Sequence, residues 1–439
     1  MSRILKITTT KGDRTMKKYK RELPKQPIIP DKPEGCFRFI QTADWHLGYS
    51  TKNSKFKEYE DVPQITAETQ SKVNIRQNDV DQRATELMKA AVKYHADMIL
   101  NAGDFYDAVW FTNPYITNKG MEICNIASQA GIPHVIIPGN HDLPMNIEKD
   151  IELRKLSELP HVYTVSNGFY KKMEFPEFNL VIHCVPSSYT QEVFDEQLEQ
   201  AGVEKVDGKI NFLISHTGVT TIGFYSENAT NSIVVNLSDI ERLGMDYVIL
   251  GDYHTPTEFE NNISFSGPLD RLGFGEEKND PRFYIVDFDL TSNQVINKTP
   301  VYLNVRPMID LPILDAKDMT VEAVMDMLRE RISLTELEGA IIRQRIRHIT
   351  DEVRVLLDQE EIDELTKESL YFGVEFIDKI RVMEDIQVEE DSFEGPVEYF
   401  DAYLKRIDHH GAYDPVKFEK ESKRILEESI NETLENNLA

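Results

Sequence analysis

The chain has 439 residues, enough for two or three domains, and its 40% hydrophobic and 28% charged residues are typical of a globular protein in aqueous solution. Its net charge of -27 argues against a general nucleic-acid-binding surface, because neutralising phosphates requires an excess of Lys and Arg. The sequence has no apolar run near the roughly 18 residues of a membrane span and no signal peptide, which argues against membrane insertion and secretion. Three scattered cysteines, Cys36, Cys124 and Cys184, indicate reduced thiols in a cytoplasm-like compartment.

Charge is distributed unevenly along the chain. Residues 1–35 carry ten Lys or Arg against four Asp or Glu, whereas residues 351–439 carry ten against twenty-six. The basic N-terminal extension, residues 1–35, can be disordered, add an edge strand through "RILKITTT" or contact DNA, and disorder is the default expectation. Because the rest of the chain is acidic, action on a polyanion would depend on metal ions, local basic patches or a partner.

Residues 36–143 repeat one pattern three times: an apolar strand, a polar loop and a segment of helical periodicity. The strands "FRFIQ", "ADMILN" and "HVIIP" run into the loops "TADWHLG", "AGDFYDA" and "GNHDLP". One predicted helix carries its apolar residues on a single face: Val80, Ala84, Leu87, Met88, Ala91 and Val92. A second predicted helix, "PYITNKGMEICNIASQAG", ends at Gly131. This alternation predicts a sheet covered on both sides, with ligand-binding loops at the carboxyl ends of its strands.

The rest of the chain predicts a second sheet and two smaller regions. The strand-like runs "NLVIHCV", "KINFLISH", "DYVILGDYH" and "RFYIVDFDL" predict the second sheet, so that residues 36–300 form one layered α/β domain. Residues 301–387 predict a small α/β capping domain whose last strand is "GVEFIDKIRV". Its helix has an apolar stripe made of Val321, Val324, Met325, Leu328 and Ile332. Residues 388–439 combine an acidic linker, "VEEDSFEGP", with amphipathic helices.

Five motifs follow strand-like runs: Asp44-Trp-His46, Gly103-Asp104-Phe-Tyr-Asp107, Gly139-Asn140-His141-Asp142, Ser215-His216-Thr217 and Gly251-Asp252-Tyr-His254. Their carboxylates, imidazoles and amide oxygen suit divalent ions such as Mn, Mg, Fe or Zn. We expect the glycines before Asp104, Asn140 and Asp252 to let the backbone turn sharply. An isolated Asp-x-His, or a His at the end of a strand, is weak evidence for a ligand, but five such loops in order predict a metal centre.

The order "DWHLG", "GDFYD", "GNHD", "SHT" and "GDYHTP" resembles the calcineurin-like metallophosphoesterases. Within them it resembles the SbcD-type DNA-repair nucleases, including the related recombination endonuclease subunits of bacteriophages. "DWHLG" is the sharpest pointer, because the protein phosphatases of the superfamily resemble "GDxHG", "GDxxDRG" and "GNHE" instead. The resemblance covers residues 37 to about 290 well, the small unit to 385 more loosely, and the tail only by position and amphipathic character. It implies a layered β-sandwich flanked by helices.

The resemblance also implies a site with two divalent ions, Mn being expected and Mg the alternative. The first ion would be held by Asp44, His46, Asp104 and His254, and the second by Asp104, Asn140, His216 and Asp252, so that Asp104 bridges the two. His141 would face the phosphate as general acid or transition-state stabiliser, and Asp107 would orient His141 or the leaving group. We expect Asp142 to be a structural hydrogen-bonding residue.

Asp252 departs from the family pattern, in which the last motif usually reads "GHxH". A carboxylate can still bind a metal and favours harder ions, so retained activity with a preference for Mn or Mg is the expected consequence. A weakened second metal site is the alternative.

Two further regions have open interpretations. The polar insertion 49–80 is either a solvated loop or a substrate-facing flap that carries Lys52, Lys55 and Lys57. In "AIIRQRIRH", alternation places Arg343, Arg345 and Arg347 on one strand face, where they either contact DNA phosphates or pair with Asp and Glu across strands.

The apolar faces of the C-terminal helices need a surface to pack on, because short isolated helices are marginal in water. The residues concerned include Val397, Phe400, Leu404 and Ile407. The resemblance favours a partner, the coiled-coil base of an SbcC-type ABC ATPase, within a heterotetramer that contains a homodimer of this chain.

The function implied is that of a metal-dependent DNA nuclease, an exonuclease on duplex ends and an endonuclease on single-stranded or hairpin DNA. It would act as the nuclease subunit of an SbcCD-type complex in repair, recombination or end processing, in the bacterial cytoplasm or in that of the host if a phage encodes it. One alternative is a phosphomonoesterase or cyclic-nucleotide phosphodiesterase on the same fold, since fold and ligands alone do not fix the substrate. Another is a degenerate, non-catalytic scaffold.

Overall fold

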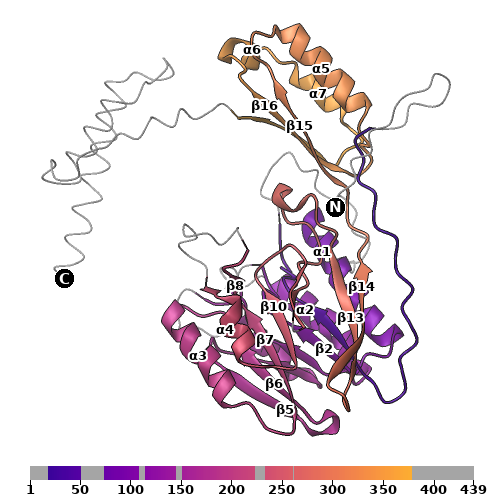
Figure 1. The fold of residues 1–439 in the computed structure, drawn as a ribbon. Coiled ribbons are helices and arrows are strands. Elements are labelled where there is room, and N and C mark those ends of the chain that lie inside the picture. Colours follow the sequence, from indigo (N-terminus) through magenta and orange to yellow (C-terminus); the bar gives the residue numbers. More distant parts are fainter. Residues whose placement is uncertain are drawn as a thin grey trace, which may run out of the picture. The chain divides into compact units, whose positions relative to one another are not determined.

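The computed structural model describes residues 18–50, 74–107, 114–144, 151–222, 233–260 and 262–377 (Figure 1). The first 17 residues, most of the insertion 49–80 and the predicted C-terminal helices therefore lie outside the described residues. Within the described ranges, no helix combines the length and apolar character needed to cross a membrane.

The first sheet has six strands in the order β14 (Gln294–Tyr302), β13 (Arg282–Asp289), β1 (Phe37–Thr42), β2 (Met98–Asn101), β3 (His134–Ile136) and β4 (Val162–Thr164). Strands β1 to β4 are parallel, whereas β13 pairs antiparallel with both β1 and β14. Assigning "RFYIVDFDL" to the second sheet was therefore wrong. As β13, this strand returns to the first sheet, where Phe39 is paired with Val286 and both are fully buried.

Helices α1 (Ile75–Lys93) and α2 (Pro114–Gln129) pack against the first sheet in one hydrophobic cluster. The side chain of Asn74 caps α1 by accepting a hydrogen bond from the Arg76 amide. The predicted apolar face of α1 is buried except at its end, where Val92 is 38% exposed.

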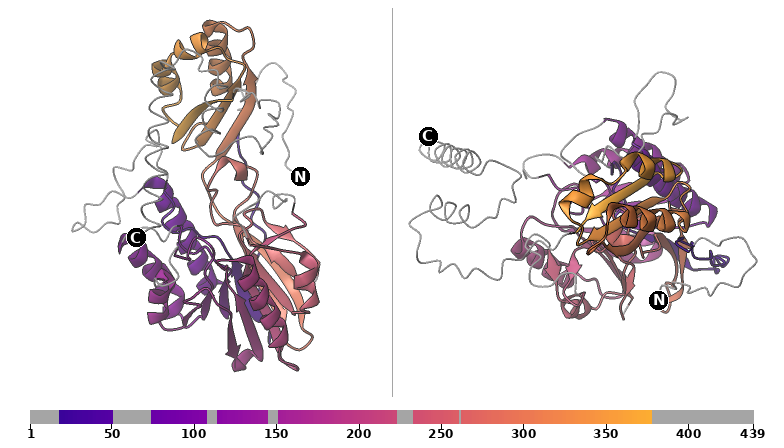
Figure 2. Two further views of the ribbon diagram at one scale, coloured as in Figure 1. Left: turned by 90° about the vertical axis from the view of Figure 1, so that its left-hand side faces the viewer. Right: turned by 90° about the horizontal axis from the view of Figure 1, so that it is seen from above.

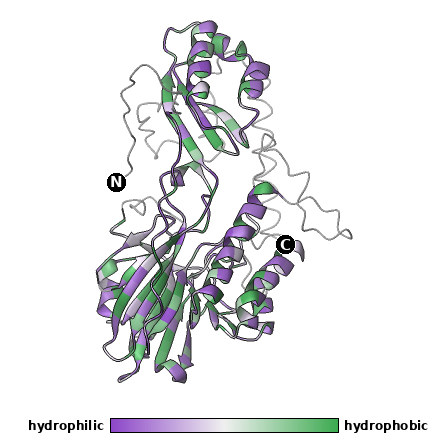
Figure 3. Cartoon of the chain, turned by 90° about the vertical axis from the view of Figure 1, so that its right-hand side faces the viewer, coloured by the Kyte–Doolittle hydropathy of each residue, from purple (hydrophilic) through white to green (hydrophobic). Residues whose placement is uncertain are grey.

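The second sheet also has six strands, in the order β11 (Thr257–Glu258), β12 (Ile263–Phe265), β10 (Tyr247–Gly251), β7 (Ile210–His216), β6 (Leu180–Val185) and β5 (Lys171–Phe175). Helices α3 (Gln191–Val203) and α4 (Leu237–Arg242) pack on it, and β8 (Gly218–Val219) and β9 (Val234–Val235) form a separate pair. A continuous core between the two sheets includes Phe39, Leu100 and Phe212, all fully buried. The layers are thus helix, sheet, sheet, helix, and along the helices hydrophobic and hydrophilic residues alternate (Figure 3).

The small unit is a three-stranded parallel sheet of β15 (Met308–Asp315), β16 (Ile341–Arg347) and β17 (Tyr371–Phe376). Helices α5 (Val321–Ser333), α6 (Asp351–Val355) and α7 (Gln359–Leu365) accompany it (Figure 2). Four residues of the predicted stripe on α5 are buried in its core: Val324, Met325, Leu328 and Ile332. The last strand begins at Tyr371, two residues before the predicted start, and residues from 378 lie outside the described part of the chain.

The N-terminal extension is ordered from Lys18 onward, so the default expectation of disorder was wrong for this part. Tyr19 donates its amide to the Leu334 carbonyl and accepts from the Glu336 amide, in an isolated β-bridge. Arg21 forms an ion pair with Asp280 at 2.6 Å. These long-range contacts give the segment the partners that a solvated arm would lack.

Candidate metal centre

The candidate ligands come from the carboxyl ends of neighbouring parallel strands in the two facing sheets. Seven side chains share this origin: Asp44 and His46 after β1, Asp104 after β2, Asn140 after β3, His216 at the end of β7, and Asp252 and His254 after β10. Because β1 to β3 are parallel, as are β7 and β10, each set of loops leaves the same edge of its sheet.

Three groups of side chains have ligand atoms within 4.8 Å of one another: Asp44 with His46 and His254, Asp44 with Asp104 and His216, and His46 with Asp104 and His141. Asp104 occupies the middle of this arrangement. Its Oδ2 lies 3.5 Å from Nε2 of His46 and 3.5 Å from Nε2 of His216. One carboxylate therefore faces imidazoles from both sheets.

Four candidate ligands have backbone conformations that L-residues rarely adopt. The φ angles are positive at Asp44 (54°), His46 (50°), Asp104 (49°) and Asp252 (98°). Each such residue costs on the order of 1 kcal/mol, and this strain typically gathers at functional sites. Hydrogen bonds hold it in place: the Asp44 amide donates to the Gly103 carbonyl at 2.9 Å, and the Asp252 amide donates to Oδ1 of Asp44 at 3.0 Å.

Glycine is required at the three motif positions for two different reasons. Gly103 has a φ of +98°, as expected for a sharp turn. Gly139 and Gly251 do not have positive φ, so the turn argument was wrong for them. Space excludes a side chain there, because a Cβ on Gly139 would collide with Asp104 and one on Gly251 with the Ala102 carbonyl.

His216 is fully buried, and hydrogen bonds fix its ring. Nδ1 lies 2.7 Å from the Ala102 carbonyl, which can only accept, so Nδ1 carries the proton. Nε2 then points to Oδ1 of Asn140 at 3.0 Å and lies 3.7 Å from Oδ1 of Asp252. This is the tautomer that a metal ligand needs, with Nε2 directed at the other candidate ligands.

His254 is oriented in the same way, by a residue that the motifs do not contain. Its Nδ1 lies 2.7 Å from Oε1 of Glu276, and its Nε2 lies 3.3 Å from Nε2 of His46. The sequence offered no signal for Glu276, because it lies 22 residues beyond His254 and outside any motif.

His141 is exposed, in contrast to the buried His216. Its Nδ1 contacts the backbone carbonyl of Asp107, and its ring meets that of His46 edge to face at 4.8 Å. The Asp107 carboxylate lies 3.3 Å from Nδ1 of His46 instead. Asp107 thus holds His141 through its main chain and His46 through its side chain.

Asp142 has the structural role that the sequence analysis expected. Its buried carboxylate accepts hydrogen bonds from the amides of Phe105, Tyr106 and Gly139 at 2.9 to 3.0 Å. These bonds tie the loop after β3 to the loop after β2. Because Asp142 is only 1% exposed, its carboxylate is not accessible to substrate.

Charge coupling shifts the pKa values across the site. Burial opposes the charged form of His216, but Asp104, Asp252 and Asp44 outweigh it and raise the pKa of His216 to about 8. Burial also opposes the charged form of His254, yet its bond to Glu276 and the charge of Asp44 raise its pKa to about 9.

Burial raises the pKa of Asp44. For Asp104 burial opposes ionisation, but His216 and His46 outweigh it and lower the pKa. The imidazoles thus balance the carboxylates, and a metal ion bound by these side chains would displace protons from the rings.

The three arginines of β16 form cross-strand ion pairs. Arg343 pairs with Asp310 at 2.8 Å and Glu375 at 3.3 Å, and Arg345 pairs with Asp310 at 2.7 Å. Arg347 pairs with Asp315 at 2.9 Å and keeps 49% of its side chain exposed. Cross-strand pairing is one of the two interpretations that the sequence left open.

Two sets of predicted functional residues lie outside the described residues. They are the candidate partner-binding residues Val397, Phe400, Leu404 and Ile407, and the lysines Lys52, Lys55 and Lys57 of the insertion.

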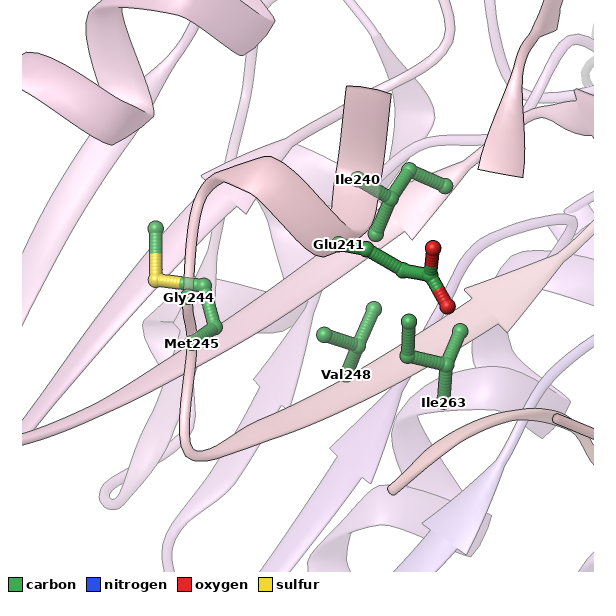
Figure 4. Close-up of a pocket in the computed structure, with 6 residues that line it drawn as sticks. All are labelled: Ile240, Glu241, Gly244, Met245, Val248 and Ile263. Carbon is green, nitrogen blue, oxygen red and sulfur yellow. The ribbon is translucent and has the colours of Figure 1, made fainter. Parts of the chain in front are cut away.

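A small hollow beside α4 contains none of the candidate ligands. It is lined by Ile240, Glu241, Gly244, Met245, Val248 and Ile263 (Figure 4). Glu241 is the single lining residue with an ionisable side chain, and one carboxylate does not make a metal site.

Comparison with known proteins agrees with this geometry. Residues 37–280 match the model of the calcineurin-like phosphoesterase family. The chain is 23% identical over 350 residues to the SbcD subunit of the nuclease SbcCD from Staphylococcus epidermidis, covering 72% of this chain and 80% of that protein. It is also 23% identical over 334 residues to the corresponding SbcD subunit from Staphylococcus saprophyticus, covering 71% and 79%. To the DNA double-strand break repair protein Mre11 of Sulfurisphaera tokodaii it is 27% identical over 244 residues, covering 52% and 59%.

The matched region contains the whole second sheet, strands β1 to β4 of the first sheet and every loop that supplies a candidate ligand, whereas β13 and β14 lie beyond it. Since the match spans more than half of the 439 residues, the chain belongs to the calcineurin-like phosphoesterase family.

Proposed function

We propose that this chain is a metal-dependent DNA nuclease and acts as the nuclease subunit of an SbcCD-type complex in DNA repair, recombination or end processing. The observation that carries the proposal is the convergence of Asp44, Asp104 and His216 with His46 and His254, next to an exposed His141. Relatives named as SbcD subunits of the nuclease SbcCD, of which this chain covers about four fifths, support the substrate class.

The residues fit a pair of divalent ions. Oδ2 of Asp44 is buried and has no hydrogen-bond partner among the described residues, a costly state for a carboxylate unless an ion is the partner. The donors are oxygen and imidazole nitrogen, which suit Mn or Mg and do not select a soft ion. We assign one ion to Asp44, His46, Asp104 and His254, and the other to Asp104, Asn140, His216 and Asp252.

When bound, two such ions supply Lewis-acid activation of a water and neutralise charge on the attacked phosphate. The protein itself positions the metal ligands and supplies a proton for the leaving group. Asp104 is placed to be shared, and the Ala102 carbonyl keeps Nε2 of His216 unprotonated toward the ion. His141, with Nδ1 against the Asp107 carbonyl, is left with Nε2 to protonate the leaving oxygen. Partial desolvation of the ring opposes the charged form of His141, but the Asp104 carboxylate and the Asp107 carbonyl outweigh it and raise the pKa of His141, which favours this donor role.

We further propose Mn as the working ion, exonuclease action on duplex ends and endonuclease action on single-stranded or hairpin DNA. Arg347 is about half exposed, so among the three arginines it is best placed to leave its ion pair with Asp315 and bind a DNA phosphate instead. The partner proposed for Val397, Phe400, Leu404 and Ile407 is an SbcC-type ATPase, in a heterotetramer that contains two copies of this chain.

The test is a substrate panel. Purified protein with Mn is incubated with linear DNA, hairpin DNA and a nitrophenyl phosphate ester, in parallel with His141→Ala. Cleavage of DNA that the His141→Ala variant loses is expected. Cleavage of the monoester alone would instead support a phosphomonoesterase, and inactivity on every substrate, also with the ATPase partner added, would support a scaffold.

A further inference from the structure

A short segment after β12, Leu272–Asn279, contacts the last metal loop at several points. Oε1 of Glu276 lies 2.7 Å from Nδ1 of His254, and its Oε2 accepts from the Leu272 amide at 2.9 Å. Asn279 donates its side-chain amide to the His254 carbonyl at 3.0 Å. The segment therefore holds both the ring and the backbone of one candidate ligand.

The geometry of Glu276 fixes two properties of His254. A carboxylate at Nδ1 requires the proton on that nitrogen, so the neutral ring directs an unprotonated Nε2 toward His46. The Glu276 side chain is only 16% exposed, and its second oxygen is held by Leu272, so the ring has one available orientation. Carboxylates in this position raise the basicity of a histidine ligand, and their loss typically lowers metal affinity about 10–100-fold.

The same segment is anchored to the small unit. The Phe274 ring lies 4.4 Å from the Arg343 guanidinium and packs in a cluster with Met308, Ile341, Leu370 and Tyr371. Phe274 and Glu276 share a single turn of 3-10 helix, Phe274–Glu276, which places the two side chains two residues apart on one short element. The arginine strand β16 and the candidate ligand His254 thus contact opposite ends of one turn.

We propose that Glu276 is a positioning residue for the metal centre and that the Phe274–Glu276 turn links the small unit to His254. Glu276 sets the tautomer and orientation of His254, and the packing of Phe274 against β15, β16 and β17 sets the position of Glu276. The inference rests on the proposed function in requiring a metal at His254, but neither DNA nor cleavage is needed to test it.

The test measures Mn binding by calorimetry in the full chain. Glu276→Ala is expected to weaken one of the two ions about tenfold or more. Glu276→Gln loses the same charge but keeps one oxygen for Nδ1–H, so a smaller loss is expected. Glu277→Gln removes the neighbouring charge while keeping an acceptor for the Asp310 amide, and wild-type affinity is expected. Equal losses in Glu276→Gln and Glu276→Ala would reduce Glu276 to a source of charge and overturn its positioning role.

A second pair of variants tests whether the Phe274–Glu276 turn links the small unit to His254. Phe274→Ala should weaken the same ion a few-fold, although Phe274 contacts no candidate ligand. Ile362→Ala opens the other core of the small unit, a cluster that does not contain Phe274, and its Mn affinity should match wild type. Unchanged affinity in Phe274→Ala, or equal losses in both variants, would overturn the link. Absence of Mn binding in the wild type would instead count against the proposed function.

Discussion

Asn140 and His141 are neighbours in the chain but face different tasks. The amide oxygen of Asn140 lies 3.0 Å from Nε2 of His216, among the candidate ligands, whereas the His141 ring is exposed and is held through its Nδ1. His141 also lies within ligand distance of His46 and Asp104, so geometry alone permits a second role as ligand.

His141→Ala separates these roles. We expect it to lower kcat for DNA cleavage about 10²–10⁴-fold, the usual contribution of a general acid, while leaving Mn affinity close to wild type. Single-turnover cleavage and Mn calorimetry measure the two quantities. A large loss of Mn affinity would make His141 a ligand and not a proton donor.

Asp252 is the residue that departs from the family pattern. It lies 3.7 Å from Nε2 of His216 and has the largest positive φ among the candidate ligands, 98°. Asp252→Ala should weaken one ion about tenfold, and Asp252→His should shift preference from Mn toward Zn, because imidazole favours borderline ions. Competition binding of Mn and Zn tests both variants. Unchanged Mn affinity and rate in Asp252→Ala would remove Asp252 from the ligand set.

The motifs predicted the candidate residues after the strands, because each follows a strand whose apolar pattern is strong, and their roles as metal ligands stay predictions. The motifs could not choose Glu276, whose role arises only when a distant turn folds back onto His254. Nor could they give the reason for Gly139, since crowding by Asp104 is a property of packing and leaves no trace in the local sequence.

At the level of elements, local periodicity predicted strands and helices well and sheet membership less well. β13 has the same apolar character as β10, but it pairs with β1 and not with the second sheet. Strand pairing is a long-range property, and a run buried on both faces fits either sheet. The segment from Lys18 was missed for a related reason, because its partners Leu334, Glu336 and Asp280 are distant in the sequence.

Helix α1 carries a buried acid that gives a pH-dependent prediction. Asp81 is 5% exposed, and burial raises its pKa to about 7. Because the folded-state pKa lies above the unfolded value, folding is not penalised near pH 4 and loses stability as the pH rises to 7. Asp81→Asn removes this loss, so its stabilising effect should be about 2 kcal/mol larger at pH 7.5 than at pH 5.

Urea unfolding of both proteins at the two pH values measures this difference. Glu258→Gln, at a half-exposed carboxylate on β11, serves as the control and should show no such trend. A pH-independent effect of Asp81→Asn would mean that Asp81 is already ionised at pH 5 in the folded protein.

At the scale of the whole molecule, a chain of net charge -27 must meet a polyanion through local features. The arginine face of β16 is one candidate, although its side chains are paired with Asp310, Asp315 and Glu375. Replacing Arg343, Arg345 and Arg347 with Gln should make the slope of log affinity for DNA against log salt less negative by about 2–3 if each arginine contacts one phosphate.

Arg347→Gln alone, at the most exposed position, should make this slope less negative by about 1. Lys367→Gln removes an exposed charge elsewhere in the small unit and should leave the slope unchanged. An unaltered slope in the triple variant would confine these arginines to a structural role.

The central claim is that Asp104 joins two ions into one centre, and the most direct test counts those ions. Calorimetric titration with Mn should find two ions per chain in the wild type and the loss of both from the measurable range in Asp104→Ala, because its carboxylate faces His46 and His216 alike. A single ion in the wild type, or one ion bound by Asp104→Ala with wild-type affinity, would contradict the shared centre.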